Sequence, residues 1–70
     1  MTNVNSANSY LNLMGYSIIE ENENFITWQN NDDSSMKVQI DKIGEEFSMM
    51  NENGDFYDWF FLDELEDFIF

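Results

Sequence analysis

Asp55–Phe70, DFYDWFFLDELEDFIF, is at once the most apolar and the most acidic segment of this 70-residue chain. After Asp58, eight apolar residues are interleaved with four carboxylates. When the segment is read at helical spacing, one face is apolar and the carboxylates occupy the remaining arc. The apolar face comprises Leu62, Leu65, Phe68 and Ile69. The segment therefore predicts a C-terminal helix, beginning between Phe60 and Asp63, that covers a core and turns its acidic side outward.

The first part of the chain predicts a short helix. Apolar residues recur at helical spacing from Ala7 to Met14, Ser6 is placed to cap the N-terminus, and Gly15 stands where a left-handed C-terminal residue is preferred. The polar residues before this helix lack an apolar pattern. We therefore expect residues 1–5 to be frayed.

The central part predicts an antiparallel meander. Alternating patterns indicate strands at residues 16–21, 25–30, 36–40 and 47–50, with a short fifth strand from Phe56. Asn22-Glu23-Asn24 is a turn signal, and Asn53-Gly54 is typical of a two-residue hairpin turn between the last two strands. We predict one α+β domain over residues 1–70: a short N-terminal helix, a four- to five-stranded antiparallel meander, and a C-terminal acidic helix packed on the sheet.

The charge is strongly one-signed. Fifteen Asp and Glu oppose Lys37 and Lys42, for a formal net charge of −13. Residues 1–19 contain no charged side chain, whereas residues 45–70 contain nine carboxylates and no Lys or Arg. Such a surface repels nucleic acid and anionic membranes and attracts basic clefts. We expect no direct binding of nucleic acid or membrane.

The inventory of side chains argues against an enzyme. The chain has no His, Cys or Arg, so the usual acid-base group, the soft metal ligands and the bidentate anion clamp are missing. A calcium loop with Gly54 in the sixth position would need carboxylates where Met49 and Phe60 stand. We predict no catalytic residue, no metal and no cofactor. Residues 1–19 show neither the basic start nor the apolar run of a secretory signal, so we expect a cytoplasmic protein.

The order of these segments is similar in layout to small uncharacterised proteins of phages and other mobile elements. The resemblance covers most of the chain and rests on Gly15-Tyr16 after the first helix, FITW at 25–28, MKVQI at 36–40, and LDELEDF at 62–68. It implies no catalytic residue at any position. It implies a phage-type origin, and therefore action in the cytoplasm of a host cell.

The acidic C-terminal third is the predicted binding site. Its carboxylates stand beside aromatic residues that could anchor a partner, and rows of carboxylates can imitate the phosphates of DNA. The predicted partner-binding residues are Glu52, Asp55, Asp58, Trp59, Asp63, Glu64, Glu66 and Asp67. We predict an inhibitor that mimics nucleic acid and occupies the basic groove of a host nucleic-acid enzyme, such as a CRISPR effector, a restriction enzyme, a glycosylase or a polymerase. Alternatives are an immunity protein or antitoxin against a basic nuclease toxin, and a structural module that self-associates as a homodimer.

Overall fold

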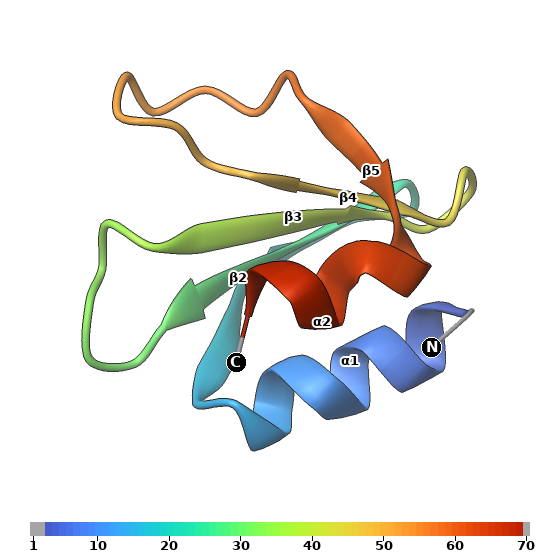
Figure 1. Cartoon of the computed structure of the whole chain (residues 1–70), viewed down its shortest axis with the longest axis horizontal. Helices are drawn as coiled ribbons and strands as arrows, with labels where there is room; N and C mark the ends of the chain where they lie inside the picture. Colours follow the sequence, from blue (N-terminus) through green and yellow to red (C-terminus); the bar gives the residue numbers. More distant parts are fainter. Residues whose placement is uncertain (1–2, 70) are drawn as a thin grey trace.

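A computed structural model describes residues 3–69 and confirms the α+β layout (Figure 1). The elements in chain order are α1 (Val4–Leu13), β1 (Tyr16–Glu21), β2 (Phe25–Asn30), β3 (Lys37–Asp41), β4 (Glu46–Met49), β5 (Trp59–Phe61), the 3-10 turn η1 (Leu62–Glu64) and α2 (Leu65–Phe68). The five strands form one antiparallel sheet in the order β1-β2-β3-β4-β5, as a meander requires. Both helices lie side by side on one face of this sheet (Figure 1).

Helix α1 begins earlier than the sequence indicated. The side chain of Asn3 accepts a hydrogen bond from the backbone N–H of Ser6 at 2.8 Å, so Asn3 is the N-cap and the prediction of Ser6 was wrong. Residues 3–5, which we expected to be frayed, are the cap and the first two helical residues. Gly15 has the left-handed backbone predicted for it, with φ of +88°. Residues 1 and 2 lie outside the described part of the chain.

The core lies between the sheet and the two helices. Cross-strand partners alternate between the two faces, so one face of the sheet carries the apolar side chains. The buried core residues are Ala7, Leu11, Tyr16, Ile26, Trp28, Val38, Ile40, Phe47, Leu62, Leu65 and Ile69. At its centre the Phe47 ring contacts Phe68 edge-on, with centroids 5.4 Å apart, and Phe60 at 5.7 Å. These ring contacts fix α2 against β4 and β5.

The connection between β4 and β5 differs from the prediction. β4 ends at Met49 and β5 begins only at Trp59, so residues 50–58 form a loop and Asn53-Gly54 does not close a two-residue hairpin. The Asn51 side chain instead accepts the N–H groups of Asn53 and Asp55 at 2.9 and 3.0 Å. The Asn51 carbonyl accepts the N–H of Gly54, whose φ is +85°. This turn competes with strand pairing and ends the hairpin early.

A hydrogen bond joins α1 to the last described residue of the chain. The hydroxyl of Tyr10, on α1, donates a hydrogen bond to the backbone carbonyl of Ile69. The final helix forms where predicted, but it is short, because one 3-10 turn precedes a single turn of α2.

Across residues 3–69, no helix has the length and apolar character needed to cross a membrane.

Candidate functional site

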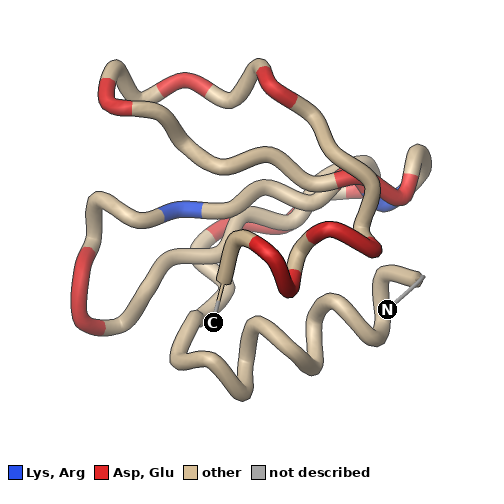
Figure 2. Tube along the Cα trace, in the orientation of Figure 1, with Lys and Arg blue, Asp and Glu red and all other residues tan. Residues whose placement is uncertain are grey.

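The negative charge surrounds most of the molecule but spares α1. Acidic residues stand on the loops at both ends of the sheet and on η1 and α2 (Figure 2). The ten residues of α1 carry no charged side chain. The distribution is therefore uneven, with an uncharged side at α1 and carboxylates elsewhere.

The predicted partner-binding residues fall into two groups on either side of β5. Glu52, Asp55 and Asp58 belong to the loop before this strand. The other four carboxylates, Asp63, Glu64, Glu66 and Asp67, belong to η1 and α2, which follow it. All seven side chains are exposed, and residues 50–69 contain no Lys or Arg. The segment around β5 thus presents seven exposed carboxylates to solvent.

Trp59 points away from the carboxylates of α2. Because side chains alternate along a strand, Trp59 and Phe60 point to opposite faces of the sheet. The Phe60 ring contacts Phe68 of α2, with centroids 4.8 Å apart, so Phe60 faces the helices. Trp59 therefore lies on the face that the helices leave uncovered, here called the open face. The structure does not bring the proposed anchor together with the four helical carboxylates.

The open face carries a row of side chains that sequence reasoning did not single out. The register pairs Phe25 with Asp41, Asp41 with Glu46, and Glu46 with Phe61, across four neighbouring strands. Two carboxylates therefore stand next to each other in the sheet, with an aromatic residue on either side. Like charges directly opposite each other destabilise a strand pair. This row is unfavourable for the isolated fold.

The second row of the open face is covered by two aromatic rings. Trp59 pairs with Ser48, and the register continues to Gln39 and Thr27. The rings of Phe25 and Trp59 approach to a centroid distance of 6.0 Å, although their strands are separated by β3 and β4. Ser48 is fully buried, and its hydroxyl has no hydrogen-bond partner among the described residues.

The two carboxylates of the first row converge beside Gly44. A Cβ atom placed on Gly44 would lie 2.8 Å from Oδ2 of Asp41 and 3.1 Å from Oε1 of Glu46. The other oxygen of Asp41, Oδ1, accepts the N–H groups of Ile43 and Gly44 at 2.9 and 3.0 Å, which fixes this carboxylate in the turn. Asp41, Gly44 and Glu46 thus form a compact acidic cluster, here called the Gly44 cradle.

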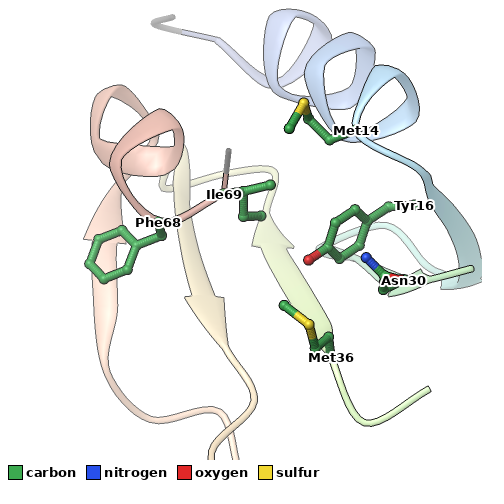
Figure 3. Close-up of a pocket in the computed structure, with 6 residues that line it drawn as sticks. All are labelled: Met14, Tyr16, Asn30, Met36, Phe68 and Ile69. Carbon is green, nitrogen blue, oxygen red and sulfur yellow. The ribbon is translucent and has the colours of Figure 1, made fainter. Parts of the chain in front are cut away.

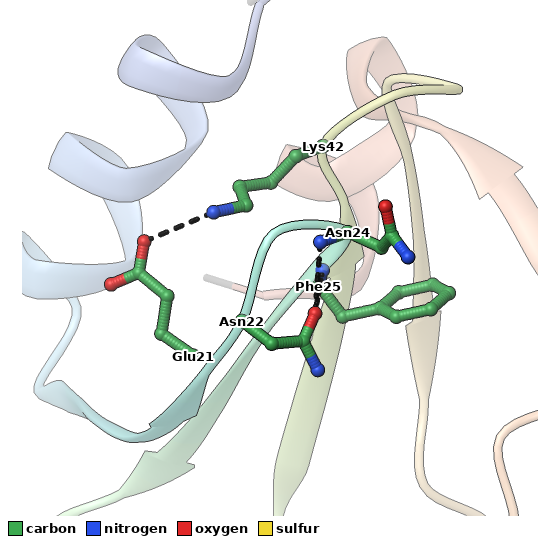
Figure 4. Close-up of polar contacts among 5 residues, drawn as sticks. All are labelled: Glu21, Asn22, Asn24, Phe25 and Lys42. Carbon is green, nitrogen blue, oxygen red and sulfur yellow. Dashed lines mark hydrogen bonds and ion pairs between the residues drawn. The ribbon is translucent and has the colours of Figure 1, made fainter.

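The two lysines do not neutralise the Gly44 cradle. Lys42 forms an ion pair with Glu21 at 3.2 Å, which links the β3–β4 turn to the end of β1 (Figure 4). Lys37 stands at the other end of β3, opposite Gln29. Lys37 and Asp41 are four positions apart, which corresponds to about 13 Å along a strand. The part of the chain that the structure describes therefore places no cation in the cradle.

A partly open cavity of about 280 Å³ lies beside the end of α2 (Figure 3). It is lined by Met14, Tyr16, Asn30, Met36, Phe68 and Ile69. Polar and apolar atoms contribute almost equally to its lining, and the Asn30 side-chain oxygen already accepts the N–H groups of Asp32 and Asp33. The cavity therefore combines apolar contact from Met14, Met36 and Phe68 with the polar groups of Tyr16 and Asn30.

The sequence did contain a signal for the cradle. Strand alternation places Asp41 on the opposite face from Ile40, and Glu46 on the opposite face from Phe47. A four-residue turn between the two strands brings both carboxylates to the same end of the same face.

Within residues 3–69, no three His, Cys, Asp or Glu side chains gather so as to hold a metal ion. Comparisons with protein-family models, with curated proteins and with solved structures gave no match to this chain. The function is therefore inferred from the surface of the molecule alone.

Proposed function

We propose that this protein is an acidic inhibitor that binds the basic, nucleic-acid-binding groove of an enzyme in place of the nucleic acid. The enzyme would belong to the host cell, if the chain derives from a phage. The observation that supports this most directly is the segment around β5. Seven carboxylates there are exposed, and no Lys or Arg lies between residues 50 and 69.

Electrostatics explains why such a surface selects a basic groove. One ion pair, between Lys42 and Glu21, is formed within residues 3–69, so most of the net charge of −13 remains unpaired. Unpaired surface charge of one sign accelerates association with an oppositely charged cleft and repels nucleic acid itself. Because α1 carries no charged side chain, the charge is unevenly distributed over the surface. The acidic side of the molecule would therefore be the side that faces the groove.

The sheet makes the carboxylates a preorganised ligand. The loop that holds Glu52 and Asp55 is tied by the side-chain hydrogen bonds of Asn51. The turns of η1 and α2 are anchored by the buried Leu62 and Leu65. Because the scaffold is already ordered, little conformational entropy is lost when the partner binds.

The proposal is tested by capture followed by competition. The tagged protein is incubated with host lysate and washed at rising NaCl concentration, and the retained proteins are identified by mass spectrometry. The captured enzyme is then mixed with labelled nucleic acid. We expect the acidic protein to release the nucleic acid, and its apparent affinity to fall steeply with salt.

Matched variants show whether the segment around β5 is responsible. Glu64→Gln, Glu66→Gln and Asp67→Asn together remove three helical charges and spare Asp63, which has an interaction partner. Glu20→Gln, Glu23→Gln and Asp32→Asn remove three exposed charges elsewhere. The first variant should compete at least about tenfold less well than the second. Equal loss in both would reject the segment as the site. Capture of a single nuclease toxin would identify an immunity protein instead, and self-association alone would identify a structural module.

A further inference from the structure

We propose that the cavity beside the end of α2 is a binding site for a small, uncharged aromatic molecule that carries a carbonyl group. The six residues that line this cavity, here called the Tyr16 pocket, are Met14, Tyr16, Asn30, Met36, Phe68 and Ile69. None of them is among the predicted partner-binding residues. The inference therefore goes beyond the proposed function and does not rest on it.

The size of the Tyr16 pocket suits a single substituted ring. Its volume is about 280 Å³, and it is partly open to solvent. A cavity of about 150 Å³ is enough to hold benzene, and pockets for drug-sized ligands begin at about 300 Å³. A benzene ring with one small polar substituent therefore fits, and the opening gives it a path of entry.

The hydroxyl of Tyr16 is the first polar group of the pocket. The Tyr16 residue is 2% exposed, yet within residues 3–69 its hydroxyl makes no hydrogen bond. In Figure 3 this hydroxyl points into the space between Met36 and Ile69. Buried polar groups of proteins are nearly always hydrogen-bonded. Because Tyr16 is covered on its other sides, a partner for its hydroxyl has to enter through the pocket.

The side-chain nitrogen of Asn30 is the second polar group. Asn30 is the cross-strand partner of Tyr16, and Figure 3 shows its nitrogen beside the Tyr16 ring. The oxygen of the same amide accepts the N–H groups of Asp32 and Asp33 at 2.8 and 3.1 Å, which fixes the orientation of the amide. Within the described residues the nitrogen donates to no group. Both polar groups can donate, so the matching group on a ligand is an acceptor such as a carbonyl oxygen.

The apolar part of the lining favours an aromatic body over an aliphatic one. Met14 follows the last residue of α1, and Met36 precedes β3, so the two side chains approach the pocket from different elements (Figure 3). Methionine side chains are flexible and polarisable, and their sulfur atoms make favourable contacts with aromatic rings. Two such side chains can therefore adapt to a flat ring that lies between them.

The charges around the pocket select an uncharged ligand. None of the six lining residues is ionisable at neutral pH, so a cation finds no carboxylate in the lining. Asp32 and Asp33 follow Asn30 in the chain and would repel an anion. Lys37 pairs with Gln29, on the face of β2 opposite that of Asn30, and therefore does not supply a positive charge to the pocket.

The direct test compares three small ligands of similar shape: benzamide, benzoate and toluene. Protein labelled with ¹³C at the methionine methyl groups is titrated with each, and the shifts are followed by NMR. We expect benzamide to bind with a dissociation constant of about 1 mM or below. It should shift the methyl signals of Met14 and Met36 but not that of Met50, which does not line the pocket. Benzoate is charged and toluene lacks the acceptor, so each should bind at least about threefold more weakly.

A matched pair of variants tests the hydroxyl. Tyr16→Phe removes it and keeps the ring, and should weaken benzamide about threefold or more while changing the affinity for toluene by less than about twofold. Tyr57→Phe removes an exposed hydroxyl in the loop before β5 and should change neither affinity. Thermal melts of both variants confirm that they are folded.

A second pair tests the volume of the pocket. Met36→Trp places a larger side chain at the rim and should weaken every ligand about tenfold by filling the space. The Met36 residue is 40% exposed, so the fold should tolerate the change. The control Leu13→Trp introduces the same side chain at a position that is 81% exposed, and should leave binding unchanged.

The contrary outcomes are equally definite. Absence of saturable shifts at Met14 and Met36, or equal benzamide affinity in Tyr16→Phe and the wild type, would mean that water alone meets the Tyr16 hydroxyl and would overturn the inference. Equal affinity for benzamide and benzoate would reject the uncharged ligand class. These results leave the inhibitor proposal standing, because competition with nucleic acid tests that proposal separately. If benzamide binds as expected but the protein displaces nucleic acid from no enzyme, the inhibitor proposal fails and the pocket stands.

Discussion

The hydroxyl of Ser48, the cross-strand partner of Trp59, is buried and has no hydrogen-bond partner among the described residues. A buried hydroxyl without a partner carries an uncompensated desolvation cost. We therefore expect Ser48→Ala to raise the free energy of unfolding by about 1 kcal/mol. Urea denaturation measures the difference. Ser34→Ala, at an exposed loop position, is the control and should change stability by less than about 0.5 kcal/mol. A destabilised Ser48→Ala would show that the hydroxyl finds a partner in solution.

The carboxylate of Asp33 stabilises the loop between β2 and β3. It accepts hydrogen bonds from the hydroxyl and the backbone N–H of Ser35, at 2.6 and 3.0 Å. The hydroxyl contact, followed by the backbone contact, lowers the pKa of Asp33 from its ordinary value of 3.8. Because the folded pKa is below the unfolded one, the stabilisation is present above pH 3.8 and is lost as the pH falls through the folded pKa.

The variant Ser35→Ala removes the larger of these two contacts. We expect the NMR titration midpoint of the Asp33 carboxyl carbon to rise toward 3.8 and to remain below it, because the backbone hydrogen bond persists. The acid-dependent part of the stability should shrink in parallel. Ser34→Ala serves as the control, and an unchanged midpoint in Ser35→Ala would mean that the hydroxyl does not donate to Asp33 in solution.

At the scale of single elements, α1 depends on its cap. The Asn3 side chain accepts the N–H of Ser6, which would otherwise have no partner within the helix. Asn3→Ala should therefore lower the free energy of unfolding by about 1 kcal/mol. Ser6→Ala should change it by less than about 0.5 kcal/mol, since the Ser6 backbone, and not its hydroxyl, makes the contact. The reverse order of effects in urea denaturation would restore Ser6 as the cap.

The first two strands could be predicted to the residue because their signals are local. The turn between β1 (Tyr16–Glu21) and β2 (Phe25–Asn30) begins at Asn22, whose side chain accepts the N–H groups of Asn24 and Phe25. Asn is common in turns for this reason. The same residue type misled the prediction at the β4–β5 connection, where Asn51, two residues before Asn53, organises the loop. The turn signals of Asn51 and of Asn53-Gly54 overlap there, and the packing of Phe60 on Phe47 sets the register between β4 and β5.

The candidate site could be predicted only in part. The exposed carboxylates around β5 follow from helical and strand periodicity, and each of the seven is exposed in the structure. The separation of Trp59 from the carboxylates of α2 does not follow, because it depends on which face of the sheet receives α2. That choice is made by the contact of Phe68 with Phe47 and Phe60, which local patterns do not encode. The convergence of Asp41 and Glu46 likewise becomes visible only in the folded turn.

For the whole molecule, the net charge of −13 opposes compaction. Salt should screen this repulsion, so the melting temperature should rise between about 0.01 and 0.5 M NaCl, where the Debye length falls from about 30 Å to a few Å. Each kcal/mol of repulsion removed corresponds to about 4–8 °C for a domain of this size. The Glu64→Gln, Glu66→Gln, Asp67→Asn variant should show a smaller rise. A melting temperature that falls with salt would mean that attraction such as the Lys42–Glu21 pair dominates.

The order of strands in the sheet repeats their order along the chain, so every strand pairs with the one that has just been made. Because the connections between paired strands are short, pairing them costs little loop-closure entropy. Strand pairing can therefore begin at either end of the meander. The two helices form at different times: α1 is synthesised before the sheet, yet the Tyr10 hydroxyl can meet the Ile69 carbonyl only after Ile69 has left the ribosome. Part of the apolar face of the sheet therefore stays uncovered until η1 and α2 have been synthesised, so the core closes late.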